Sequence, residues 1–96
     1  MEFRFTSELW RYRSDNAWHF ITLPQTIADV IRAEGEPVRR GFGSVRVEVT
    51  IGDSTWTTSV FPDTESGSFV LPVKKPVRHA EHIEDGDEVA VVLRLA

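Results

Sequence analysis

The sequence predicts a mainly β protein, a compact barrel of six strands with two short helices at its ends. Apolar and polar residues alternate with a period of two over most of the chain, which is typical of half-buried strands. Two short stretches, 24–34 and 74–82, are instead compatible with helices. Mostly antiparallel strands and two helices in a chain of 96 residues favour a barrel, and we treat residues 1–96 as one domain.

The first predicted element is an N-terminal hairpin. Residues 2–12 alternate in polarity, with Phe3 and Leu9 on the face opposite to Trp10, so they should form a half-buried strand. A segment rich in turn-forming residues follows. Residues 17–23 are then predicted to form the return strand.

A short helix is predicted next, over residues 24–34. Pro24 suits the first turn of a helix because its missing N–H has no partner there in any case. Apolar residues recur from Ile27 at the spacing of one helix face. Gly35 is a natural helix stop.

The clearest hairpin joins residues 44–51 to residues 54–61. Gly52 comes first in the two-residue turn between them, which fits a type II′ turn. Such a turn pairs Val49 with Trp56, and the apolar residues of the two strands then share one face. Turn geometry and hydrophobic pattern therefore predict the same register. In that register Ile51 pairs with Ser54, Val47 with Thr58, Val45 with Val60, Glu48 with Thr57 and Arg46 with Ser59.

The C-terminal part adds two strands and the second helix. After a predicted loop at 62–67, residues 68–73 should form a short strand. Residues 74–82 form a short helix, in which Pro76 is tolerated only in the first turn. Residues 88–95 are apolar on both faces and are predicted to be a central strand.

The two halves of the chain resemble each other. Residues 20–31 (FITLPQTIADVI) and 69–79 (FVLPVKKPVRH) each combine a strand, a Leu-Pro step and a helix. Each is followed by a glycine and a strand with alternating valines. Such a repeat implies a pseudo-twofold structure. The alternative is that Leu-Pro is simply a common way to begin a helix.

Two long segments resemble a known family. RRGFGSVRVEVTIGDSTWTTSVFP (39–62) and FVLPVKKPVRHAEHIEDGDEVAVVLRL (69–95) are similar to the domain of unknown function 1905 family of small bacterial proteins, and the resemblance extends from Phe3 to Leu95. It implies a six-stranded double-split β-barrel capped by helices, a fold class that also holds the AbrB, MazE and MraZ transcription-factor domains. Two chains build the barrel in those domains, whereas the internal repeat suggests that one chain supplies both halves here. The resemblance implies no catalytic residues.

Composition excludes several classes of function. The chain has no cysteine, so it forms neither disulfides nor a cysteine-based zinc site. It has no Walker A, G-x-S-x-G or H-E-x-x-H motif, and we expect no cofactor and no enzymatic activity. A net charge of −4 argues against nucleic acid as a partner. Without an apolar run that spans a membrane or marks a signal peptide, we expect a cytoplasmic protein with no membrane partner.

Basic residues gather in two short segments and form the main candidate site. Cations at the start of the second helix oppose its dipole, at a cost of about 0.3–1 kcal/mol each. Lysines beside free N–H groups there suggest an anion site, to which a glycine-rich loop would add backbone donors. The alternative is that these cations pair with the acidic stretch 81–88 or are solvated, and the two segments need not converge. The anion-site candidates are Arg39, Arg40, Gly41, Phe42, Gly43, Lys74, Lys75 and Arg78.

Three further features have a structural and a functional interpretation. The hydroxyl-rich strand around Trp56, Thr57 and Ser59 is either an exposed strand face or a polar groove for a ligand or an added strand. The aromatic set is either covered by a helix or forms a self-association surface; it consists of Trp10, Tyr12 and Trp18. His79 and His82 share a helix face, but two histidines without a third ligand predict no metal site.

These observations favour a non-enzymatic binding module for an anionic small molecule or an acidic partner. A DNA-binding regulator is the first alternative, on the analogy with AbrB-like domains, and the net charge opposes it. An enzyme with an unrecognised site is the second alternative.

Overall fold

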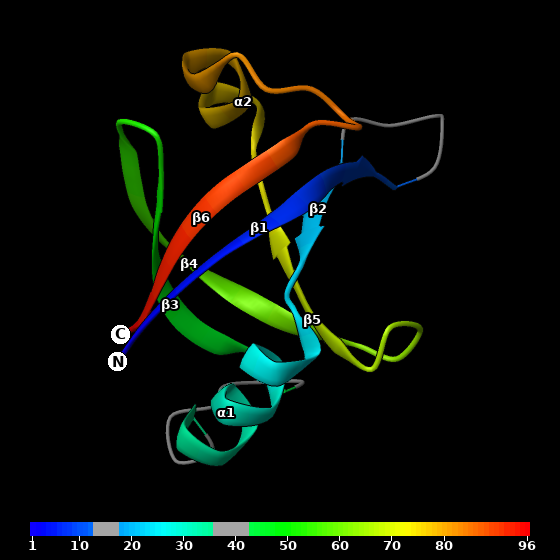
Figure 1. The fold of residues 1–96 in the computed structure, drawn as a ribbon, viewed down its shortest axis with the longest axis vertical. Helices are drawn as coiled ribbons and strands as arrows, with labels where there is room; N and C mark the ends of the chain where they lie inside the picture. Colours follow the sequence, from blue (N-terminus) through cyan, green and yellow to red (C-terminus); the bar gives the residue numbers. More distant parts are fainter. Residues whose placement is uncertain (13–17, 36–42) are drawn as a thin grey trace.

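The computed structural model describes residues 1–12, 18–35 and 43–96, and in it six antiparallel strands close into a barrel. The order around the barrel is β1, β2, β5, β4, β3, β6. The predicted fold class, a mainly β barrel of six strands with two helices, is confirmed (Figure 1). The elements are β1 (Glu2–Arg11), β2 (His19–Thr22), α1 (Gln25–Gly35), β3 (Val45–Ile51), β4 (Ser54–Asp63), β5 (Ser68–Pro72), α2 (Lys75–Glu81) and β6 (Glu88–Leu95).

The β3–β4 hairpin has the predicted register. Val49 lies opposite Trp56 and Ile51 lies opposite Ser54. Gly52 has a φ of 58°, which the first position of a type II′ turn requires and which glycine adopts without a steric penalty. A single-residue slip would turn the buried valines of β3 to solvent, so burial and turn geometry together hold the register.

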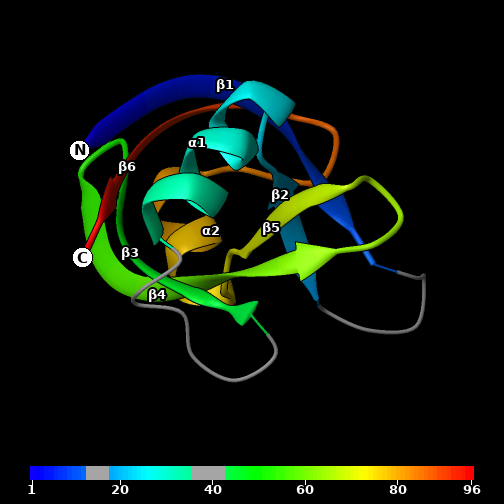
Figure 2. The same ribbon diagram turned by 90° about the horizontal axis from the view of Figure 1, so that it is seen from below.

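The pseudo-twofold arrangement is visible where β2 and β5 lie side by side. The N–H of Leu23 donates to the carbonyl of Phe69, and the N–H of Val73 donates to the carbonyl of His19, each at 3.0 Å. These two hydrogen bonds occupy equivalent places just before α1 and just before α2. Each strand therefore leads into its own helix, and the helices cap opposite ends of the barrel (Figures 1 and 2).

Apolar side chains from all six strands fill the barrel. On each strand every second residue points inward, as the period-two pattern predicts. Helix α1 closes one end by burying Ala28 and Ile31, whereas α2 contributes only partly buried side chains. The fully buried strand residues include Leu9, Ile21, Val45, Val47, Val49, Val60, Leu71 and Leu93. Burial of this apolar surface is the main force that stabilises the barrel.

Two boundaries and one burial pattern differ clearly from the prediction. Strand β4 continues through Pro62 and Asp63, which we expected in a loop, and they pair with β5. A proline near the end of a strand is tolerated because few ladder hydrogen bonds remain to be lost. Helix α2 is shorter than predicted because His82 adopts a left-handed conformation and ends it. Strand β6 has a neighbour on each side, β1 and β3, as expected of a central strand, but it is not buried on both faces: Val89, Val91 and Leu93 are buried and the residues between them are not.

Candidate functional site

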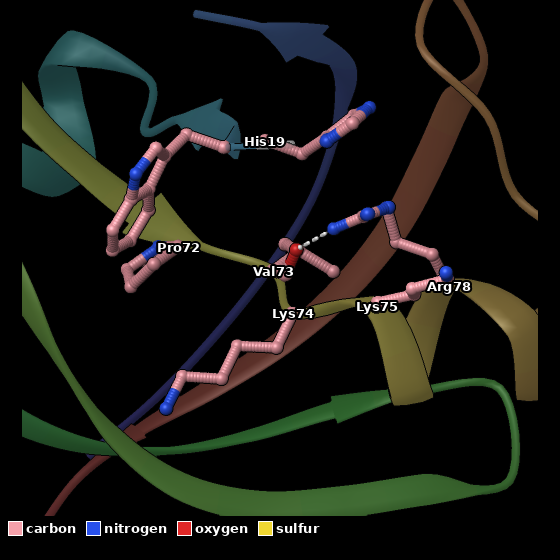
Figure 3. A pocket seen from close by; sticks show the side chains of 7 residues that line it. His19, Pro72, Val73, Lys74, Lys75 and Arg78 are labelled. Carbon is pink, nitrogen blue, oxygen red and sulfur yellow. Dashed lines mark hydrogen bonds between the residues drawn. The ribbon is translucent and has the colours of Figure 1, made fainter. Parts of the chain in front are cut away.

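The site begins where β5 passes into α2. Val73 is buried after the end of β5, and exposed Lys74 and Lys75 follow it. Pro76 lies in the first turn of α2, where its missing N–H costs nothing. From the next turn, Arg78 reaches back, and its Nη1 donates to the Val73 carbonyl at 2.6 Å (Figure 3). The guanidinium group is therefore held beside the strand end rather than extended into solvent.

Strand β2 supplies the opposite wall. The hydrogen bond from Val73 to the His19 carbonyl places the start of β2 beside the start of α2. In Figure 3 the His19 side chain lies across from Arg78, and Lys74 extends to the other side of the opening. The hollow between these elements has a volume of about 260 Å³. We call it the cationic pocket; it is lined by Trp18, His19, Pro72, Val73, Lys74, Lys75 and Arg78.

The charge of the cationic pocket has one sign. Its described lining carries two ammonium groups and one guanidinium group, and no carboxylate. Glu81, from the acidic stretch expected to neutralise these cations, instead accepts a hydrogen bond from Ser54 Oγ at 2.6 Å. Among residues 1–12, 18–35 and 43–96, no carboxylate forms an ion pair with Lys74 or Lys75. The pocket therefore presents positive charge on a protein whose net charge is −4.

The other predicted anion-site residues lie elsewhere or outside the described residues. Arg39, Arg40, Gly41 and Phe42 belong to a segment that the structure does not describe. Gly43 lies beside Pro62 of β4 and is not among the described residues that line the cationic pocket. The structure thus brings Lys74, Lys75 and Arg78 together and places Gly43 away from them.

The predicted groove residues of β4 do not share a face. Trp56 points into the barrel and packs against the hydrophobic core. Thr57 and Ser59 point to the outside, opposite Glu48 and Arg46 of β3. Because strand side chains alternate between faces, a groove that contains both Trp56 and Thr57 is not formed.

The aromatic set lies on the outside of the barrel, and the interpretation that a helix covers it is wrong for Tyr12 and Trp18. Tyr12 is 43% exposed and Trp18 is 57% exposed. Trp10 is partly buried, and its Nε1 donates to Thr22 Oγ1 at 2.9 Å. These three rings gather around Phe20, which was not among the predicted site residues. The alternation of side chains identifies Phe20 from the sequence, because Phe20 comes two residues after Trp18 and therefore lies on the same face.

Trp18 and His19 line the cationic pocket, although neither was predicted as an anion-site residue. They approach α2 only because β2 and β5 pair, and no local pattern places them there. Within the described ranges, no three histidine or carboxylate side chains converge as a metal site requires. Nor does that part of the chain contain a helix long and apolar enough to cross a membrane.

Comparison with known proteins agrees with the resemblance seen in the sequence. No curated protein matches the chain. The model of one family, described as a domain of unknown function (DUF1905), matches residues 5–93. This match covers every strand and both helices, apart from the first residues of β1 and the last residues of β6. The chain therefore belongs to the DUF1905 family.

Proposed function

We propose that the protein is a binding module for a small anionic molecule, which it holds in the cationic pocket. The observation that carries the proposal is that Lys74, Lys75 and Arg78 all line one hollow whose described lining has no carboxylate. Like charges brought together without counter-charges repel one another, and a bound anion relieves that repulsion. A partner with phosphate or carboxylate groups fits this arrangement.

Each cation has a distinct task in the proposed site. Arg78 is oriented by its hydrogen bond to Val73, which uses one of the five donors of the guanidinium group and leaves others for a ligand. Its planar fork suits bidentate contact with a phosphate or carboxylate. Lys74 and Lys75 are exposed and flexible, so they act as adjustable point charges at the mouth of the pocket.

The size and walls of the pocket limit the ligand. A volume of about 260 Å³ lies below the usual range of roughly 300–1,000 Å³ for pockets that take drug-sized molecules. The exposed indole of Trp18 offers a flat apolar wall on which a small planar group can stack. A phosphate or carboxylate attached to a small, flat body therefore fits best.

Calorimetric titration at constant ionic strength tests this proposal. The probes are inorganic phosphate, adenosine monophosphate and citrate, with sodium chloride as the ionic control. We expect at least one probe to bind, and we expect Lys75→Ala to weaken it about tenfold, since a hydrogen bond to a charged group contributes roughly 1.5–3 kcal/mol. The matched control is Arg46→Ala, which removes an exposed cation from β3, outside the pocket lining.

Two results would overturn the proposal. One is the absence of binding by any of the three anions. The other is an equal loss of affinity in the Arg46 and Lys75 variants, which would indicate a general charge effect. Binding to a mixed DNA duplex that weakens steeply with salt, while the small anions fail to bind, would instead favour the DNA-binding alternative.

A further inference from the structure

A second hollow lies on the outer face of β1 and β2, and its walls are aromatic. Trp10 and Phe20 are direct cross-strand partners. The N–H of Tyr12 donates to the Trp18 carbonyl at 2.9 Å, which continues the same pairing by one step. The four rings therefore form two cross-strand pairs on one face, because the pair between them, Arg11 and His19, belongs to the opposite face of the two strands.

The four rings contact one another at different angles. Phe20 is central, with Trp10 at 5.3 Å and Tyr12 at 6.3 Å between ring centroids. The Tyr12 ring is nearly perpendicular to Phe20, at 84°, whereas the Trp18 ring is nearly parallel to it, at 6°. The rings therefore present surfaces of different orientation to the hollow that they line.

Acidic residues complete the rim of this hollow. The end of β4 and the turn that follows it bring Asp63 and Glu65 beside the rings, and Val70 of β5 contributes an apolar side chain. The N–H of Ser66 donates to Asp63 Oδ2 at 3.1 Å, which orients that carboxylate. The hollow has a volume of about 350 Å³, and its described lining has no lysine or arginine. We call it the aromatic hollow; it is lined by Trp10, Tyr12, Trp18, Phe20, Asp63, Glu65 and Val70.

We propose that the aromatic hollow binds a small organic cation, an alkylammonium or quaternary ammonium group. The face of an aromatic ring carries partial negative charge and attracts cations, and tryptophan does so most strongly. Carboxylates at the rim add a longer-range attraction for positive charge. Alkyl groups on the cation bury apolar surface against the rings, which a hydrated metal ion does not. Aromatic walls and rim charge therefore select the same ligand chemistry.

This inference is independent of the proposed anion pocket. The two hollows share only Trp18 among their described lining residues. Their charged residues have opposite sign, with carboxylates on one side of Trp18 and Lys74, Lys75 and Arg78 on the other. A variant in either set leaves the charges of the other set unchanged, so each serves as a control for the other.

A nuclear magnetic resonance titration of the full chain tests the cation site. The probe is choline, and the comparison is its uncharged carbon isostere, 3,3-dimethylbutan-1-ol, at matched ionic strength. The chain has three tryptophans, so the indole N–H signals distinguish the sites. We expect choline to shift the Trp10 and Trp18 signals in a saturable way and to leave Trp56, which faces the core, unchanged. The neutral isostere should bind about tenfold more weakly.

Variants locate the site and separate charge from folding. Glu65→Gln should weaken choline several-fold without changing the fold, because Glu65 is exposed. Tyr12→Ala should weaken it by a comparable factor through loss of one ring. Glu34→Gln, an exposed residue of α1, is the matched control for charge, and Lys75→Ala is the control for the other pocket; neither should weaken choline.

Three outcomes would overturn this inference. Equal binding of choline and its isostere would mean that the hollow recognises apolar shape and not charge. Absence of a saturable shift at Trp10 and Trp18 would mean that no cation binds. Broadening of these signals with protein concentration, reversed by dilution and unaffected by choline, would mean that a second copy of the chain occupies the surface.

Discussion

Gly52 at the tip of the β3–β4 hairpin offers a sharp test of how the hairpin supports α2. Its φ of 58° lies where residues with a side chain are strained. A Cβ at this position would meet Oε1 of Glu81 and lie 2.8 Å from its Cδ. That carboxylate accepts a hydrogen bond from Ser54 Oγ at 2.6 Å and a longer one from the Asp53 N–H at 3.4 Å. Gly52→Ala therefore strains the turn and displaces the side chain that joins the hairpin to α2.

The expected cost follows from these two effects. A left-handed backbone costs an alanine about 1–2 kcal/mol. Loss of the Glu81 contacts adds about 1 kcal/mol, the usual net contribution of one hydrogen bond. We therefore expect Gly52→Ala to lower the free energy of unfolding by about 2–3 kcal/mol.

A double-mutant cycle with Glu81→Ala separates the two effects. Urea unfolding should show a loss of about 1 kcal/mol for Glu81→Ala alone, with an unchanged m-value. In the double variant the methyl group has no carboxylate to displace, so its stability should equal that of Gly52→Ala. Strictly additive losses would refute the contact between the hairpin tip and α2.

Three other changes test the core, a buried hydrogen bond and a surface ion pair. Leu93→Ala, in the barrel interior, should lower the free energy of unfolding by about 2–5 kcal/mol in urea, and a loss below 1 kcal/mol would contradict its full burial. Ser68→Ala should cost about 1–3 kcal/mol by the same measurement, because Ser68 Oγ donates to the buried Leu23 carbonyl at 2.8 Å; an unchanged midpoint would show that this bond contributes nothing. Hydrogen bonds from Arg94 and Arg4 hold the pKa of Glu2 below its usual 4.5, so its stabilising contribution is complete above that value and is lost as pH falls through the lower, folded pKa. A plot of the free energy of unfolding against pH over this acidic range should therefore be flatter for Glu2→Gln than for the parent protein. Parallel plots for the two proteins would contradict the linkage.

Local patterns were sufficient for the β3–β4 hairpin. Two independent constraints, the two-residue turn at Gly52 and the alternation of valines, lead to the same pairs within 18 residues of chain. Neither constraint depends on the rest of the fold, so the register was predictable. The same alternation along β2 contained the information that Phe20 faces outward with Trp18.

The cationic pocket was only half predictable. Lys74, Lys75 and Arg78 are close in sequence, and their gathering at the start of α2 is a local property. The wall formed by Trp18 and His19 depends on the pairing of β2 with β5, which joins residues about fifty positions apart. Side-chain periodicity carries no information about which strands become neighbours, so this wall required the structure.

The partners of charged residues were the least predictable feature. One alternative was that the acidic stretch 81–88 is the counter-charge for the lysines at the start of α2. Glu81 instead turns to the hairpin tip, where Ser54 Oγ and the Asp53 N–H converge. The choice between these partners depends on which side of α2 faces β4, and that is set by packing and not by sequence distance.

The central claim, that the cationic pocket holds a small anion, is tested most directly by mapping where an anion binds. The measurement is a ¹⁵N-resolved titration of the full chain with inorganic phosphate at constant ionic strength. We predict saturable shifts of the backbone amides of Val73, Lys74, Lys75, Val77 and Arg78 and of the Trp18 indole. The Trp56 indole and the amide of Arg46 should be unchanged. Shifts that do not saturate, or that are as large at Arg46 as at Lys75, would contradict the account.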